Sequence, residues 1–102
     1  MKHHYSRARD LGGKYRDHNL RRSKEAYAQS DMTLFEIRDE YIIYTSRSME
    51  TIRKHCKEIY FRKRELGKTG NEMLFPRFGF YDRIRVLRDY RNRRYGKGDK
   101  AA

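Results

Sequence analysis

The fold depends most on residues 33–66, which read TLFEIRDEYIIYTSRSMETIRKHCKEIYFRKREL. Thr33 and Glu36 have the spacing of a capping box, in which each side chain bonds the backbone N–H of the other residue. Gly67 follows the stretch, at the position where a left-handed C-terminal cap is usual. Acidic residues gather at the start and basic residues at the end, as the helix dipole favours. These features predict a long central helix over residues 33–66.

The apolar residues of this stretch recur at helical spacing. At about 100° per residue they share one side of a helix. They are Leu34, Ile37, Tyr41, Met49, Ile52, Cys56, Ile59 and Leu66. Ile43 and Phe61 fall on the opposite side, so they need a second contact or remain exposed.

The middle of the stretch favours helix least. Residues 41–45 are β-branched or aromatic and favour a strand in isolation. Residues 45–48, Thr-Ser-Arg-Ser, can bond nearby backbone and favour a break. We expect one continuous helix, about 50 Å long at ~1.5 Å per residue. The alternative is two helices hinged near residues 46–48.

Composition limits the size of the core. The chain has 102 residues, of which 36% are hydrophobic and 39% charged, with a net charge of +12. It is therefore at most one domain with a thin core. The positive charge is concentrated on the flanks, at +5 for residues 1–30 and +6 for residues 67–102, against +1 for residues 31–66. Such flanks indicate a polyanion, usually nucleic acid and less often an anionic membrane surface, or else serve solubility alone.

The chain is predicted to be mainly α, in three parts. Residues 1–16 form an extended basic arm, residues 17–95 a single small helical domain, and residues 96–102 a polar tail. Within the domain, residues 17–29 are compatible with a short N-terminal helix that places Leu20 and Tyr27 on one side. No apolar run reaches the ~18 residues that a transmembrane segment needs.

A shorter C-terminal helix is predicted over residues 82–94. Its apolar seam is expected to be Phe80, Ile84 and Leu87, surrounded by arginines. Before it, residues 71–80 are aromatic and irregular, because Pro76 and Gly79 prevent a regular helix. We expect Phe75, Phe78 and Phe80 to cover the long helix, and the alternative is base stacking.

The candidate nucleic-acid-binding residues are the cations of the arm, of residues 17–29 and of the C-terminal third. Arginine is prominent among them, and its planar guanidinium binds phosphate in a bidentate way. The set is Arg7, Arg9, Lys14, Arg16, Arg21, Arg22, Arg77, Arg83, Arg85, Arg88, Arg91, Arg93 and Arg94.

The sequence contains no arrangement typical of an active site. Residues 67–69 read Gly-Lys-Thr, but Arg62 stands where a phosphate-binding loop needs its first glycine. Cys56 lies on the apolar stripe, which suggests a core thiol. We therefore expect no enzyme, no metal and no cofactor.

These observations favour a non-catalytic, RNA-binding structural subunit of a large ribonucleoprotein particle, bound to RNA such as rRNA and to neighbouring proteins. In general character the chain resembles ribosomal proteins. One alternative is an accessory or structural subunit of a multi-protein assembly, either an organelle membrane complex or a viral particle. A third is a small DNA-binding regulator. An intracellular location is expected, in the cytoplasm or the mitochondrion. Residues 1–30 contain arginines as a mitochondrial presequence does, but Asp10 and Asp17 interrupt them.

Overall fold

A computed structural model of the chain describes residues 20–96. Residues 1–19 and 97–102 lie outside the described part, and with them the predicted arm and nearly all of the predicted tail. The described part is mainly helical and contains no strand, which confirms the predicted class. Its elements are α3 (Lys24–Gln29), α4 (Leu34–Tyr44), α5 (Met49–Glu65), the 3₁₀ turn η1 (Asn71–Met73), α6 (Phe80–Arg91) and the π turn η2 (Asn92–Gly96).

The predicted central helix is two helices, so the expectation of one continuous helix is wrong. The start of α4 and the end of α5 agree with the two ends predicted for residues 33–66. The Glu36 N–H donates to Thr33 Oγ1 at 3.1 Å, and the Thr33 N–H donates to Glu36 Oε1 at 2.9 Å. At the far end Gly67 has φ of +80°, and the Lys68 N–H donates to the Lys63 carbonyl at 3.0 Å, which completes a Schellman cap.

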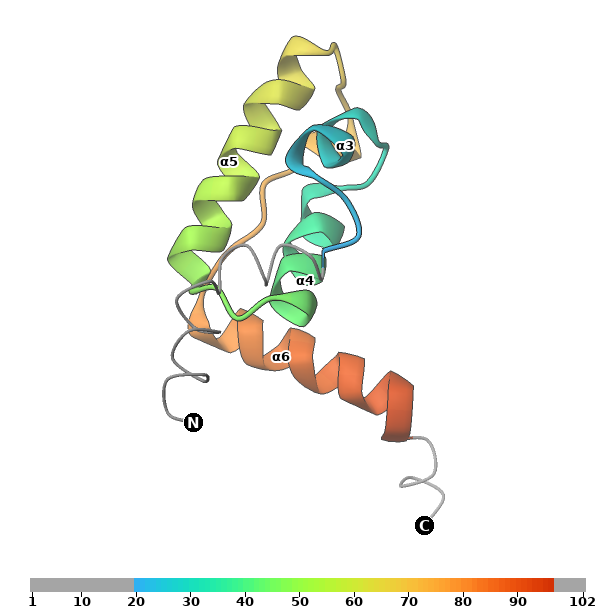
Figure 1. Cartoon of the computed structure of the whole chain (residues 1–102), viewed down its shortest axis with the longest axis vertical. Helices are drawn as coiled ribbons and strands as arrows, with labels where there is room; N and C mark the ends of the chain where they lie inside the picture. Colours follow the sequence, from blue (N-terminus) through green and yellow to red (C-terminus); the bar gives the residue numbers. More distant parts are fainter. Residues whose placement is uncertain (1–19, 97–102) are drawn as a thin grey trace, which may run out of the picture.

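The break falls at residues 45–48, where the alternative placed a hinge. The Thr45 hydroxyl donates to the Tyr41 carbonyl at 2.6 Å, and the backbone of Thr45 is extended. Ser48 then caps α5 by accepting from the Thr51 N–H at 3.2 Å. The short polar side chains thus replace the helical bonds that a continuous helix would make. As a result α5 turns back and runs beside α4 (Figure 1).

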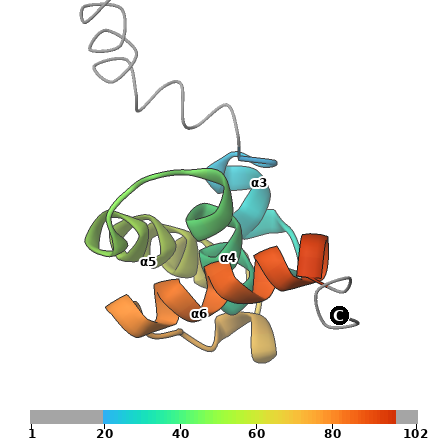
Figure 2. The same cartoon turned by 90° about the horizontal axis from the view of Figure 1, so that it is seen from below.

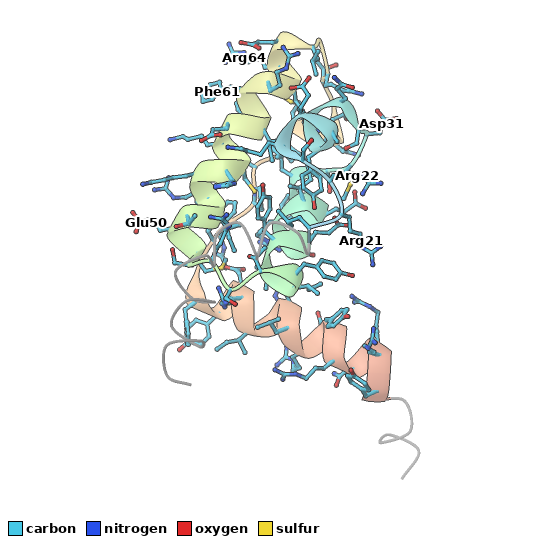
Figure 3. All side chains as sticks on the ribbon, in the orientation of Figure 1. Arg21, Arg22, Asp31, Glu50, Phe61 and Arg64 are labelled. Carbon is cyan, nitrogen blue, oxygen red and sulfur yellow. The ribbon has the colours of Figure 1, made fainter. Side chains whose placement is uncertain are left out.

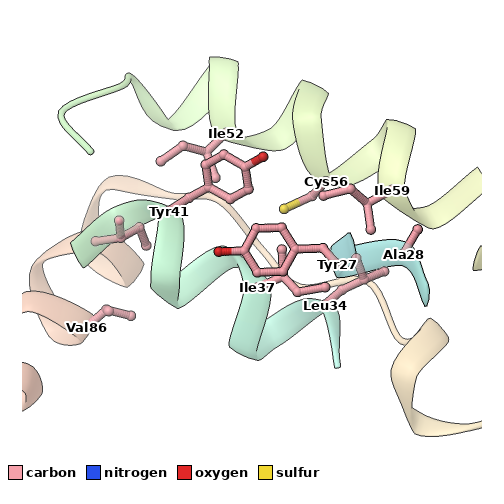
Figure 4. Packing of buried hydrophobic residues seen from close by; sticks show 10 residues of the cluster. Tyr27, Ala28, Leu34, Ile37, Tyr41, Ile52, Cys56, Ile59 and Val86 are labelled. Carbon is pink, nitrogen blue, oxygen red and sulfur yellow. The ribbon is translucent and has the colours of Figure 1, made fainter. Parts of the chain in front are cut away.

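Folding back brings the two halves of the apolar stripe face to face. The buried core combines residues of all four α-helices, and the rings of Tyr27 and Tyr41 lie at a tilt to one another with 5.8 Å between centroids (Figure 4). Burial of a large aliphatic side chain stabilises a fold by about 1.5–3 kcal/mol. The core residues are Tyr27, Ala28, Leu34, Ile37, Tyr41, Ile42, Ile52, Cys56, Ile59 and Val86. Of the predicted stripe, Met49 is only partly buried against this core, and Leu66 stays 38% exposed.

Helix α3 is attached to α5 by a buried lysine. Ser23 caps the start of α3, and Tyr27 and Ala28 are fully buried. The Lys63 ammonium is also fully buried, and it donates to the Ser30 carbonyl at 2.7 Å and to the Ala28 carbonyl at 3.4 Å. A cation at a helix C-terminus complements the dipole, so Lys63 stabilises α3 as well as the end of its own helix.

A buried arginine holds the segment that leads to α6. Arg38 is only 3% exposed, and its guanidinium donates to the Arg77 carbonyl at 2.7 Å and contacts the Asp39 carboxylate at 3.0 Å. Burial raises the pKa of Asp39 above its ordinary value. Helix α6 then lies across the end of the α4–α5 pair, as both views show (Figures 1 and 2). It packs mainly on α4.

The predicted C-terminal helix exists, but it begins earlier, at Phe80, and its expected seam is wrong. Asp82 and Val86 are the residues that α6 buries, with Leu87 partly buried. Phe80 and Ile84 remain 69% and 42% exposed. The buried side of α6 differs from the expected one because the helix packs on α4 through Val86, which the expected seam did not include.

Of the three phenylalanines expected to cover the long helix, one packs against the core and is partly buried. Phe78 packs against the core, whereas Phe75 is 41% exposed and Phe80 lies outside. Phe75 still contacts Tyr60 of α5, edge to face, at 5.8 Å between ring centroids. The predicted cover of the long helix is therefore confirmed for Phe78 and wrong for Phe80. Phe75 contacts the helix but remains partly exposed.

Candidate nucleic-acid interface

The outer face of α6 combines arginines with exposed apolar rings. Arg85, Arg88 and Arg91 are spaced three residues apart, and all three are exposed. At about 100° per residue they fall on the side opposite Val86. Phe80, Tyr81 and Ile84 lie on the same side, and Tyr81 is 81% exposed. We call these six residues the α6 outer face.

The charge of this face is only partly neutralised within the described residues. Arg85 donates to Asp82 at 3.2 Å. Arg88 lies 4.0 Å from Asp89, at the limit of an ion pair, and Arg91 makes no ion pair with a described carboxylate. Two acids on α6 therefore face six arginines between residues 80 and 95. Exposed pairs of this kind are weak, so phosphate can compete for these guanidinium groups.

Asp82 organises the start of α6 more than it neutralises charge. Its Oδ2 accepts from the Gly79 N–H at 3.0 Å, and its Oδ1 contacts Arg85. The backbone hydrogen bond from Gly79, and then Arg85, hold the pKa of this carboxyl below its ordinary value. Arg77 lies farther away, at 3.8 Å, and its side chain is 86% exposed at the edge of the α6 outer face.

Two of the predicted binding arginines have structural partners. Arg83 donates to the Arg47 carbonyl at 2.8 Å, so it closes the loop between α4 and α5. Arg94 donates to the hydroxyls of Tyr95 and Tyr90, at 3.0 and 3.3 Å. Tyr95 is itself 66% exposed, next to the exposed Arg93.

The fold places one arginine of the N-terminal segment near the end of α6. Arg21 donates to the Tyr44 hydroxyl at 2.8 Å, with its guanidinium 4.9 Å from the ring centroid. The Tyr44 ring meets the Tyr90 ring edge to face at 6.5 Å. Arg21 and Arg22 lie on the side of the molecule towards the C-terminal end of α6 (Figure 3). Arg7, Arg9, Lys14 and Arg16 lie outside the described residues.

The exposed rings of this face were not predicted, because Phe80 and Ile84 share a side with Leu87 and were assigned with it to a buried seam. Val86 was the available sign, since it is an apolar residue that lies opposite Arg88 on a helical wheel. A seam centred on Val86 would have predicted that Phe80, Tyr81 and Ile84 face outward.

The single cysteine of the chain, Cys56, is buried in the core. Burial raises the pKa of the Cys56 thiol to about 12, so the thiolate that a nucleophile needs is disfavoured. Within residues 20–96 no cluster of His, Cys, Asp and Glu is suited to a metal ion. No helix of the same residues combines the length and apolar character needed to cross a membrane.

Comparison with known proteins gives no further guide. No protein-family model matches the chain, and neither a curated protein sequence nor a solved structure matches it. What the α6 outer face can bind is therefore inferred from its own side chains.

Proposed function

We propose that the chain is a non-catalytic, RNA-binding structural subunit of a large ribonucleoprotein particle. The observation that supports this proposal is the α6 outer face, where two exposed rings at the start of the helix are followed on the same side by three exposed arginines. Arginines neutralise phosphates and release counterions, while aromatic rings stack on unpaired bases. Together these are the contacts that single-stranded and looped RNA offers.

Duplex DNA is the poorer fit to this face. A helix that enters a DNA major groove reads base edges with polar side chains. The other outward positions of α6 are Phe80, Tyr81 and Ile84, none of which reads a base edge by paired hydrogen bonds. Looped RNA can place its unstacked bases against such side chains, because those bases are not held in a continuous stack.

The test compares two variants that remove equal charge from different helices. One replaces Arg85, Arg88 and Arg91 by Ala on α6. The other replaces Arg53, Lys54 and Arg64, which are exposed on α5 and make no ion pair with a described carboxylate. Binding of a looped RNA and of duplex DNA is measured by fluorescence anisotropy between about 50 and 200 mM salt.

The measured quantity is the slope of the logarithm of the RNA-binding constant against the logarithm of the salt concentration. We expect this slope to be shallower in the α6 variant by about 0.7 per phosphate contact removed, or about two units in all. The α5 variant should retain most of its slope. Tyr81→Ala should weaken RNA binding about fivefold or more without changing the slope, because stacking is not ionic. Equal losses in the two charge variants would show that RNA senses only net charge, and the proposal would then fail.

A subunit of a multi-protein assembly is the second candidate. It is favoured by exposed apolar side chains away from α6, namely Phe61 at 49% and Leu74 at 57% exposure. The two functions are compatible, since structural subunits of ribonucleoprotein particles also contact neighbouring proteins.

A further inference from the structure

A small apolar groove lies between α5 and η1, apart from the α6 outer face. It is lined by Lys57, Tyr60, Phe61, Met73 and Phe75 and has a volume of about 270 Å³. Sites for drug-sized ligands usually have about 300–1,000 Å³, so this groove suits one or two large side chains rather than a cofactor. Phe61 projects from α5 on the side away from α4 (Figure 3).

The rings of the groove form a concave wall. Phe61 meets Tyr60 edge to face at 5.2 Å between centroids, and Tyr60 meets Phe75 edge to face at 5.8 Å. The interplanar angles are 77° and 81°, so the three rings line the wall with edges and faces in turn. The flexible Met73 completes a surface that adapts to an apolar side chain.

The rim of the groove is positively charged. Lys57 lies in it, and Arg53, Lys54 and Arg64 are exposed on the same side of α5 at helical spacing. None of these four cations forms an ion pair with a carboxylate of the described residues. Glu50 lies on the same side of α5 at its N-terminal end, near Arg53 and Lys54, so the cations nearest the groove are Lys57 and Arg64. The acidic residue of η1, Glu72, interacts electrostatically with the buried Lys63.

The charge of the rim also distinguishes between the possible occupants of the groove. A second copy of this chain would bring another net charge of +12 to a basic rim, and residues 1–19 are themselves basic. An acidic partner gains from the same rim, both in encounter rate and in orientation. We propose that the groove docks an acidic segment of another protein, which inserts one or two large apolar side chains between Phe61 and Phe75.

The proposal is tested by selecting a displayed library of random peptides on the full chain, with Phe61→Ala as the counter-selection target. We expect enriched peptides to combine Asp or Glu with a Phe, Leu or Trp anchor. A synthetic copy of the best peptide is then titrated by fluorescence anisotropy. Replacing its anchor by Ala should weaken binding about tenfold or more, since a buried large side chain contributes that much.

Variants of the protein test separately the apolar contact made by Phe61 and the charge of the rim. Phe61→Ala should weaken the peptide about tenfold or more, whereas Tyr81→Ala on α6 is the matched control and should change affinity less than about twofold. Lys57→Glu should weaken the acidic peptide and strengthen a copy whose acids are changed to lysine. Since Phe61 is half exposed, its replacement should leave the fold intact, which circular dichroism checks.

Three results would overturn the proposal. One is a selection that enriches peptides without acidic residues, or that enriches no peptide at all. Another is self-association of the chain in sedimentation that Phe61→Ala abolishes, which would make a second copy the occupant. The third is an RNA oligonucleotide that shifts the backbone amide resonances of residues 57–61 and 73–75. Because the groove and the α6 outer face are separate surfaces, peptide binding and RNA binding succeed or fail independently.

Discussion

Helix α5 buries Ile52, Cys56 and Ile59 almost completely, whereas α6 buries Val86 and leaves Phe80 and Ile84 in contact with solvent. Both helices are basic, capped and amphipathic in sequence. They differ in how many neighbours each one has. Helix α5 packs against α3, α4 and η1, while α6 lies across one end of the bundle and packs mainly on α4. Apolar residues in a basic helix therefore indicate a core only where enough of the chain covers them.

The largest expected effect is on stability and follows directly from this comparison. Ile52→Ala should lower the free energy of unfolding by about 2–5 kcal/mol, because it leaves a cavity in the core. Ile84→Ala on α6 should cost clearly less, about 1 kcal/mol or below, because that side chain is already 42% exposed. Urea unfolding followed by circular dichroism measures both. Similar losses in the two variants would mean that Ile84 is buried in solution.

The next effect concerns Lys63, the charged residue that α5 buries. Lys63→Met keeps most of the side-chain volume but leaves the Ser30 and Ala28 carbonyls without their donor. We expect a loss of about 1–3 kcal/mol in unfolding free energy, and faster hydrogen exchange in α3. Arg62→Met removes the half-exposed ion pair between α5 and Glu25 of α3, and by comparison it should cost less than about 1 kcal/mol. If Lys63→Met were more stable than the natural chain, desolvation of the ammonium would outweigh its hydrogen bonds.

A smaller effect is expected at the break between α4 and α5. Ser48→Ala removes the side-chain acceptor that caps α5 and should cost about 1 kcal/mol. Ser46→Ala, two residues earlier and exposed, makes a suitable control. Thermal unfolding monitored at the helix band compares the two. An unchanged melting temperature for Ser48→Ala would show that residues 45–48 turn for another reason, with packing of the two apolar faces as the remaining cause.

The smallest effect is a pH dependence confined to the start of α6. The pKa of Asp82 is lowered in the folded chain, so its stabilising contribution is present above the ordinary carboxyl pKa and is lost as the pH falls through the lowered value. We expect the Gly79 amide resonance to shift on acidification below about pH 4. Asp82→Asn should abolish that shift, and Asp89→Asn should not. A Gly79 titration that persists in Asp82→Asn would assign it to another carboxyl group.

The sequence by itself determined the local features of this protein. The Thr33–Glu36 pair began a helix, Gly67 ended one, and the helical period selected the side of residues 33–66 that is buried. Each of these depends on bonds or positions within a few residues, which a chain specifies before it folds. The arginine-rich helix near the C-terminus was likewise predictable, apart from its first residues.

Tertiary structure decided the rest. Residues 45–48 could continue a helix or break it, and the break prevails because folding back buries both halves of the stripe at once. The orientation of α6, and with it the exposure of Phe80 and Tyr81, depends on Val86 docking on α4. The partners of Arg38, Lys63 and Arg83 are backbone carbonyls 39, 33 and 36 residues away along the chain. Contacts at that separation arise only from packing, so charge patterns alone could not distinguish these structural cations from those left free to bind.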